Sequence, residues 1–396
     1  MSSKNIKYPL IQEPYNNQDI SKAITVLKSR QITMSKITNE LEKKFAKYVG
    51  SKYALMVNSG SSANLLAAFA LVNPRKKGYI KNGGEFIIPA LCWSTSLWPL
   101  VQAGLKPRFV DVNVNNFNIE ISDLKKKINK KTKVIMAVHV LGNSTNMDEL
   151  MKIVRQNNIF LIEDTCESLG SKFGSKHLGT LGDIGTYSFY VSHQMSSGEG
   201  GMIVCNSKAD YDLLYSMRAH GWSRKLSKVN KKDTSFNFIN SGFNLRPTDV
   251  SAAIGLNQFK RLKKMINIRT ENRKKIIKKI QNSPRWNNQF SFLKVNNKVK
   301  PSFFGLPILV SKKYLGKKKK FLSFLKKKGI ETRKIISGNF INQESVKLYG
   351  FNNPKNKFPN AQEIDDRGFF IGLHPKKISN RELEYLEKNL LKINIL

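Results

Sequence analysis

Apolar residues recur in the first half of the chain with two alternating spacings. Short apolar runs predict strands at residues 53–57, 85–90, 107–112, 133–140 and 160–164. Between these runs, apolar residues three or four positions apart predict helices, as Ile37, Leu41 and Phe45 illustrate. Strands that alternate with helices over such a length predict an α/β fold, with a mostly parallel sheet between layers of helices.

The rhythm changes after a long helix, rich in Lys and Arg, that the pattern predicts from 258 to about 280. Strands are predicted beyond it at 303–310 and 331–336, and helices at 319–328 and 382–391. We therefore expect a large domain over 1–260, followed by a connector helix and a small α+β domain over 261–396.

Aromatic and polar side chains follow the ends of several predicted strands. Trp93, His139 and Asp164 follow such strands, and His193 lies in a Gly-rich loop after the strand predicted at 186–190. Open α/β sheets bind ligands at the carboxyl ends of their strands. A single histidine in a loop is weak evidence of chemistry, but several polar strand ends together predict a ligand site at this edge.

Composition narrows the classes of function. The net charge is +40, from 68 basic and 28 acidic residues, but the lysines are spread along the chain. We expect a solvated basic surface rather than nucleic-acid binding, because no DNA-reading motif accompanies the charge. No apolar run predicts a membrane span or a signal peptide. Three widely spaced cysteines fit neither zinc nor disulfide patterns, so we expect free thiols in the cytoplasm and no metal.

Several motifs together resemble the DegT/DnrJ family of nucleotide-sugar enzymes, and the resemblance covers nearly the whole chain. The matching segments are NSGSSAN (58–64), ALCWSTS (90–96), FVDV (109–112), EDTCESLG (163–170), GTYSFY (185–190) with H193 and GEGGM (198–202), GFNLRPTDVSAAIG (242–255), ETRKIISGNF (331–340) and GLHP (372–375). This resemblance implies the pyridoxal-phosphate fold of type I, which is similar to that of aspartate aminotransferase. It also implies pyridoxal or pyridoxamine phosphate as the cofactor.

The resemblance assigns roles in cofactor binding to single residues. It places Asp164 at the ring nitrogen, Trp93 on the ring face and Glu167 near the 3-hydroxyl, where many relatives have Gln. The phosphate ligands that it implies are Gly60, Ser61, Ser188 and, from the partner subunit of a homodimer, Asn244. The local pattern alone also allows a plain helix cap for the small-residue turn or for Asp164, and core packing for Trp93.

One position departs from the aminotransferases of this family. Five residues after Ser188 they carry the lysine that binds the cofactor covalently, and this chain has His193. An imidazole forms no imine, but it exchanges protons near neutral pH. The same exchange is typical of the sugar 3-dehydratases in the family, which serve deoxysugar and lipopolysaccharide O-antigen biosynthesis.

This departure implies a lyase that removes the C3 hydroxyl of a nucleotide-linked 4-keto-6-deoxyhexose, with His193 as acid and base. We favour a GDP-linked substrate and glutamate as the amino donor. The CDP-linked branch uses an iron–sulfur cluster that is usually held by four thiolates, and this chain has three cysteines. The alternatives are a CDP-linked 3-dehydratase, an enzyme that acts on another sugar, or an inactive sensor with this fold.

Two further residues are weaker candidates. His220 is predicted to contact the sugar or to assist protonation, with a helix C-cap as the equally plain alternative. Arg333 is predicted to hold the glutamate carboxylate or the diphosphate, because a guanidinium suits both anions, although it is otherwise an ordinary surface arginine.

Overall fold

The large sheet has seven strands, and one of them runs against the rest. In the computed structural model, which describes residues 6–33, 35–223, 226, 236–352 and 357–395, the strand order is β1-β9-β8-β5-β4-β2-β3. The bounds are β1 Tyr53–Val57, β2 Glu85–Pro89, β3 Lys106–Val110, β4 Thr132–Val138, β5 Phe160–Asp164, β8 Ile184–Ser188 and β9 Gly201–Cys205. β9 pairs antiparallel with both neighbours, and the remaining pairs are parallel. The predicted mostly parallel sheet is confirmed, but the sequence pattern missed β9.

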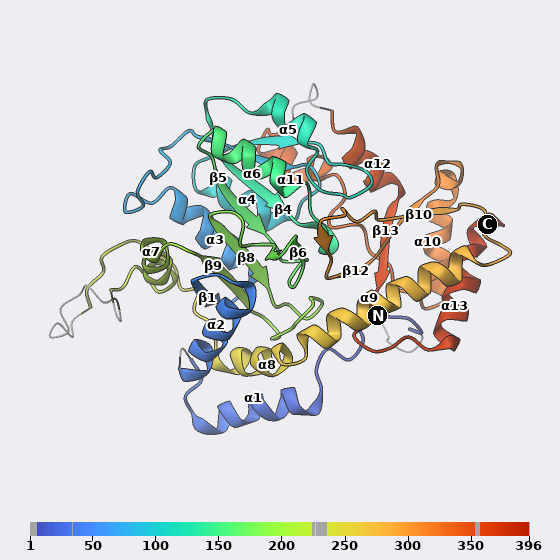
Figure 1. Ribbon diagram of the computed structural model, residues 1–396, viewed down its shortest axis with the longest axis horizontal. Helices are drawn as coiled ribbons and strands as arrows, with labels where there is room; N and C mark the ends of the chain where they lie inside the picture. The colour runs from blue at the N-terminus through green and yellow to red at the C-terminus, as the bar shows by residue number, and fades with distance from the viewer. Residues whose placement is uncertain (1–5, 34, 224–225, 227–235, 353–356, 396) are drawn as a thin grey trace.

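Helices cover both faces of this sheet, as Figure 1 shows. The helices of this part are α1 Asn17–Ser29, α2 Lys36–Val49, α3 Gly60–Leu71, α4 Ser94–Gln102, α5 Ile121–Lys127, α6 Met147–Gln156, α7 Lys208–Arg218 and α8 Asp249–Phe259. Successive residues of a strand point to opposite faces. Thus Leu55 of β1 joins the apolar cluster that contains Leu66 of α3, whereas Met56 joins the one that contains Phe45 of α2.

A second sheet and a group of helices form the C-terminal part. α9, Leu262–Gln281, leads into this part, and Figure 1 shows it as the long yellow helix that connects the two regions. The sheet has the order β10-β12-β13, with bounds Phe290–Phe292, Gly305–Val310 and Gly368–Gly372. Its helices are α10 Lys318–Lys327, α11 Glu344–Leu348, α12 Pro359–Arg367 and α13 Asn380–Leu390. A third, small sheet joins β11 Val299–Lys300 to β6 Lys172–Phe173 and β7 Lys176–His177.

The prediction of a strand at 331–336 was wrong. Arg333 alone makes a bridge there, to Phe370 of β13. Ile336 has a φ of 49°, in the left-handed region, so the chain turns away before a ladder can form. The N–H of Glu331 instead donates to the carbonyl of Tyr8, 3.0 Å away. This contact ties the N-terminal segment to the C-terminal sheet, and the division into domains at residue 260 stays a prediction.

Two neighbouring segments also differ from their predicted bounds. The helix expected from residue 258 begins at Leu262, because α8 ends at Phe259 and a turn separates the two helices. The strand predicted over 133–140 ends at Val138, and His139 starts a short turn. Among the described residues, no helix is both long and apolar enough to cross a membrane.

Candidate active site

Asp164 is the last residue of β5, and polar groups from distant parts of the chain fix its carboxylate. Oδ2 accepts hydrogen bonds from Asn64 Nδ2 at 2.8 Å and from Ser96 Oγ at 2.7 Å. The backbone N–H of Cys166 donates to Oδ1 at 3.2 Å. Thr186 Oγ1 donates to the other end of the Asn64 amide, 2.6 Å away, and so sets its orientation. A buried carboxylate with this many donors is held in one position.

The N-terminus of α3 provides a cradle next to this carboxylate. Ser59 caps the helix by accepting the N–H of Ser62 at 3.1 Å, so the first turn starts at Gly60 with free backbone N–H groups. A Cβ at Gly60 would lie 2.5 Å from Cβ of Ser188 and 2.9 Å from its hydroxyl oxygen. The end of β8 therefore approaches this helix terminus so closely that only glycine fits. Free N–H groups with hydroxyls beside them are a donor set suited to a phosphate.

An aromatic side chain stands at the start of α4. Trp93 precedes the helix, and 56% of its surface is exposed. Ser96, one turn later, holds Asp164, and Thr95 Oγ1 accepts a hydrogen bond from Ser61 Oγ at 3.2 Å. The start of α4 thus joins the cradle to the carboxylate. An exposed indole at such a point suits a flat ring that stacks on it.

His193 lies in the loop after β8. Its backbone N–H donates to the carbonyl of Tyr190 at 3.0 Å, and its ring centre is 5.2 Å from that of Phe304. Nδ1 is buried and has no hydrogen-bond partner among the described residues. Burial, with a smaller contribution from the charge of Arg269, lowers the pKa of His193 to about 3. The imidazole is therefore neutral at physiological pH, in the form that accepts a proton.

Glu167 lies three residues after Asp164 and has an unusual acidity. Its Oε2 accepts the N–H of Leu141 at 3.1 Å. Burial raises the pKa of Glu167 to about 7, and the nearby charge of Asp164 adds to the shift. A carboxyl group that titrates near neutral pH exists both as donor and as acceptor, which suits a ligand hydroxyl.

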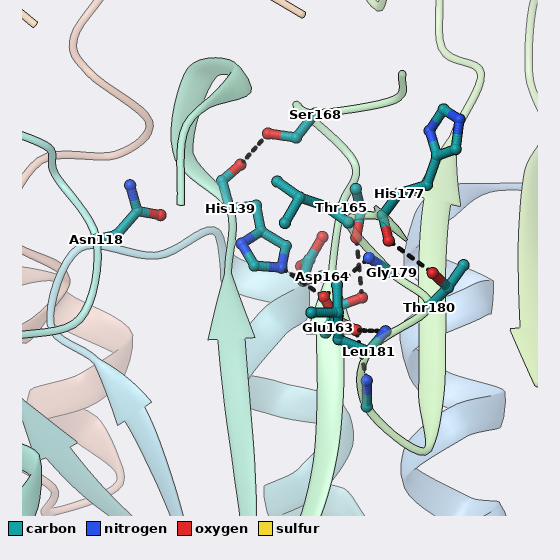
Figure 2. Close-up of polar contacts among 12 residues, drawn as sticks. Asn118, His139, Glu163, Asp164, Thr165, Ser168, His177, Gly179, Thr180 and Leu181 are labelled. Atoms are coloured by element: carbon teal, nitrogen blue, oxygen red, sulfur yellow. Dashed lines mark hydrogen bonds and ion pairs between the residues drawn. The ribbon is translucent and has the colours of Figure 1, made fainter. Parts of the chain in front are cut away.

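A second layer of contacts lies behind Asp164, on the preceding residue of the same strand. Figure 2 shows Glu163 between His139 and the loop that contains Gly179 and Leu181. Glu163 accepts hydrogen bonds from His139 Nε2 at 2.9 Å and from the N–H groups of Gly179, Leu181 and Gly182 at 2.8, 2.7 and 2.7 Å. We infer that this set of donors to Glu163 positions the strand end that carries Asp164.

Three residues that the sequence predicted for the site, His220, Asn244 and Arg333, form no hydrogen bond to the site residues described above, within the described part of the chain. His220 is exposed, with a φ of 63°, directly after the C-cap residue of α7. Asn244 is exposed, and its Oδ1 accepts from Arg246 Nε at 2.9 Å. Arg333 is exposed on the segment beside β13. Their roles stay predictions.

Asn64 and Ser96, which donate hydrogen bonds to Asp164, are site residues that sequence reasoning missed. Both fall within the quoted motifs, NSGSSAN and ALCWSTS. Their spacing could have revealed them. Asn64 lies about one helical turn after Gly60, and Ser96 lies about one turn after Trp93, so each shares a helix face with a predicted site residue. The described residues fit pyridoxal phosphate: a fixed carboxylate for the ring nitrogen, a cradle that a Cβ would fill, an exposed indole and an orphaned imidazole nitrogen.

Comparison with known proteins decides the family. The model of the DegT/DnrJ/EryC1/StrS aminotransferase family matches residues 14–388. The chain belongs to this family. It is 38% identical over 395 residues to the GDP-4-keto-6-deoxy-D-mannose 3-dehydratase of Escherichia coli O55:H7, with 97% of this chain and 100% of that protein covered.

Solved structures agree with this membership of the DegT/DnrJ/EryC1/StrS family. The E. coli GDP-4-keto-6-deoxy-D-mannose-3-dehydratase with bound hydrated PLP matches with a TM-score of 0.90 at 37% identity, over 98% of this chain and 100% of that one. A GDP-4-keto-6-deoxymannose-3-dehydratase with a trapped PLP-glutamate geminal diamine matches with a TM-score of 0.89 at 37% identity, over 97% and 100%. The fold is the type I pyridoxal-phosphate fold, and pyridoxal phosphate is the cofactor of the family.

Proposed function

We propose that this chain is a nucleotide-sugar 3-dehydratase that removes the C3 hydroxyl of GDP-4-keto-6-deoxymannose. One observation carries the proposal. By the spacing of the motif, His193 stands five residues after Ser188, where the resemblance expects the family's covalent lysine, while Asp164, Trp93 and Ser188 are retained. The similarity to named GDP-4-keto-6-deoxymannose 3-dehydratases over nearly the whole chain supports the same activity.

Different residues would bind different parts of the cofactor. Asp164, with its position fixed by its donors, would hydrogen-bond the ring nitrogen and keep it protonated, and Trp93 would cover one face of the ring. Gly60, Ser61 and Ser188 would hold the phosphate through backbone N–H and hydroxyl donors. When bound, the amine form of the cofactor supplies a nitrogen for the C4 ketone and a ring that takes up electrons.

His193 moves the protons in this proposal. Nδ1 is buried, so Nε2 is the nitrogen available to a substrate. Nε2 takes a proton from the reacting centre and delivers one to the departing C3 hydroxyl, which leaves as water. Phe304, whose ring centre is 5.2 Å from that of His193, helps to exclude bulk water, which would otherwise compete for these protons.

The overall reaction balances without an outside oxidant or reductant. The sugar loses one oxygen, and glutamate becomes 2-oxoglutarate and ammonia by gaining one. We favour glutamate because one similar structure contains a PLP-glutamate adduct. We favour the GDP-linked sugar because that nucleotide stands in the names of the similar enzymes, and because three cysteines fall short of the usual four cluster ligands. We place the reaction in the cytoplasm, where free thiols stay reduced.

We also propose a homodimer in which Asn244 completes the partner's site. Exposed apolar side chains support an interface: Ile20, Ile24 and Leu27 form one stripe on α1, and Phe236 and Phe238 stack near the 240–246 segment. His193→Asn and Asn244→Ala chains would each be inactive alone. Mixed dimers of the two variants contain one intact site, so mixing after reversible dissociation should restore turnover. No restoration, although mixed dimers have formed, would place Asn244 in its own subunit's site or outside any site.

A turnover assay tests the activity. Protein, pyridoxal phosphate, L-glutamate and GDP-4-keto-6-deoxymannose are mixed in air without a reductase, and the sugar, 2-oxoglutarate and ammonia are followed by mass spectrometry and enzymatic assay. Loss of the C3 oxygen with ammonia release, absent in His193→Asn, is expected. An amino sugar as product would reject the dehydratase in favour of transamination. Turnover of only a CDP-linked sugar would correct the substrate, and no turnover of any nucleotide sugar would favour the sensor.

A further inference from the structure

Arg269 on α9 lies behind the catalytic loop and contacts His193. Only 7% of its surface is exposed. Its Nε donates to the carbonyl of Leu373 at 3.0 Å, and its Nη2 donates to the carbonyl of His193 at 3.3 Å. One guanidinium thus joins the loop that carries the imidazole to the segment that follows β13. Asn272, on the same face of α9, holds that segment as well by donating to the carbonyls of His374 and Lys376.

The charge of this guanidinium is not compensated. No carboxylate among the described residues forms an ion pair with Arg269, and its Nη1 is buried without a hydrogen-bond partner there. Burial lowers the pKa of Arg269 to about 10, so the side chain is still a cation at neutral pH. An interior cation without an acid is costly in free energy. Energetically unfavourable features such as a buried, unpaired cation are concentrated at functional sites. The group beside this cation is the imidazole of His193.

The surroundings of His193 contain few other charges. His193 lines a cavity of about 30 Å³, and Arg269 and His374 are the other titratable residues that line it. Tyr190 faces the imidazole from its own loop at 6.4 Å between ring centres, and Phe304 of the C-terminal part is apolar. His374 is engaged with the carbonyl of Pro9, 2.7 Å from its Nε2. No Asp or Glu is among the described residues that line the cavity.

We propose that Arg269 is a positioning residue for the reaction, which anchors the backbone of His193 and, as an uncompensated cation, disfavours a second positive charge on the imidazole. The catalytic consequence of this inference rests on the proposed role of His193. The electrostatic part of the inference concerns the apoprotein and does not depend on that role.

The direction of the effect follows from like charges. A second cation beside Arg269 is unfavourable, so the guanidinium adds to burial in lowering the pKa of His193. Removing the charge in Arg269→Gln should therefore raise the pKa of His193. Arg269→Lys keeps the charge and should leave the pKa nearly unchanged, although it loses one of the two carbonyl contacts.

NMR titration of the imidazole signals tests the electrostatic part on the apoprotein. The chain has five histidines, and the His193 signal is the one missing from His193→Asn. In the wild type it should stay neutral from mildly alkaline pH to the onset of acid unfolding. In Arg269→Gln its protonation should begin at higher pH. Arg273→Gln is the matched control, because Arg273 lies one turn further on α9 and donates to the carbonyl of Leu293 instead. A His193 signal that titrates alike in wild type and Arg269→Gln would overturn the proposal.

Turnover tests the anchoring part. Arg269→Gln should lower kcat for loss of the C3 oxygen by about tenfold with little change in KM, because the base is displaced rather than the sugar site. Arg269→Lys should recover part of kcat. Thermal melting of each variant shows whether the chain is folded, and the Lys variant keeps the test decisive if the Gln variant is not. Unchanged kcat in folded Arg269→Gln would reject the anchoring role. The NMR titration needs neither cofactor nor substrate. It therefore tests the effect of Arg269 on His193 even if the protein turns out not to be a dehydratase.

Discussion

Nε2 of His139 lies 2.9 Å from Oε2 of Glu163, and both side chains are buried directly behind Asp164. Burial alone would raise the pKa of Glu163. The hydrogen bond and charge of His139, together with the N–H groups of Gly179 and Gly182, nevertheless keep this pKa below its usual value. The carboxylate form therefore stabilises the fold above the unfolded-state pKa, and this contribution is lost as the pH falls through the folded-state pKa.

Glu163→Gln should destabilise the protein by about 3 kcal/mol, because an amide would present N–H groups to donors that need an acceptor. Urea unfolding at neutral pH measures this free energy. Glu40→Gln is the control, since Glu40 pairs with Lys44 on the surface with side chains 49% and 50% exposed. That change should cost less than about 0.5 kcal/mol. Equal stability of the two variants would contradict the role assigned to Glu163.

Glu167 should make stability depend on pH in the opposite sense. Its pKa is raised by burial from 4.5 to about 7, so the folded apoprotein holds a proton that the unfolded chain releases earlier. The associated stability is fully present below the unfolded-state pKa and is lost as the pH rises through about 7.

Glu167→Gln, which does not titrate, removes this dependence. At about pH 8 the variant should be more stable than the wild type by up to about 3 kcal/mol, and at about pH 4 the two should be nearly equal. Urea unfolding of the apoproteins at both values checks the prediction. The same difference at both pH values would show that packing, rather than titration, separates them.

Gly60→Ala should weaken cofactor binding. The new Cβ would meet Cβ of Ser188 at 2.5 Å and would push apart the two sides of the cradle. Overpacking of about 1–3 kcal/mol corresponds to a loss of affinity of about tenfold or more. Titration of the apoprotein with pyridoxal phosphate, followed by absorbance, measures it. Gly316→Ala is the control, since nothing lies within 4 Å of its Cβ position. Equal affinities in the two variants would remove Gly60 from the phosphate site.

A buried ion pair fixes the end of α7 to α2. Arg218 Nη1 donates to Glu42 Oε1 at 2.9 Å and to the carbonyl of Met56 at 2.6 Å, and both charged side chains are buried. Arg218→Met leaves a buried carboxylate alone and should cost about 3–5 kcal/mol. Adding Glu42→Gln removes that charge and should recover a large part of the loss. Additive effects in a double-mutant cycle, measured by urea unfolding, would show that the pair is not coupled.

The sequence by itself determined the fold class and most of the candidate site. The alternation of apolar spacings predicted the strands β1 to β5 and their helices, because period and length are local properties of the chain. The motifs placed Gly60, Trp93, Asp164, Ser188 and His193 at strand ends and helix starts. The structure brings Gly60 against Ser188, and Ser96, one turn after Trp93, against Asp164.

Only the tertiary structure decided which distant groups meet. Asn64 and Ser96 reach Asp164 from 100 and 68 residues away in the chain, and Arg269 reaches the carbonyl of His193 from 76 residues away. β9 pairs antiparallel with β1 on one side and β8 on the other, and both partners lie far from each other in the chain. The segment predicted as a strand at 331–336 forms no ladder, and its Ile336 has a left-handed φ. Such contacts depend on where whole elements pack, and a local pattern of polar and apolar residues does not carry that information.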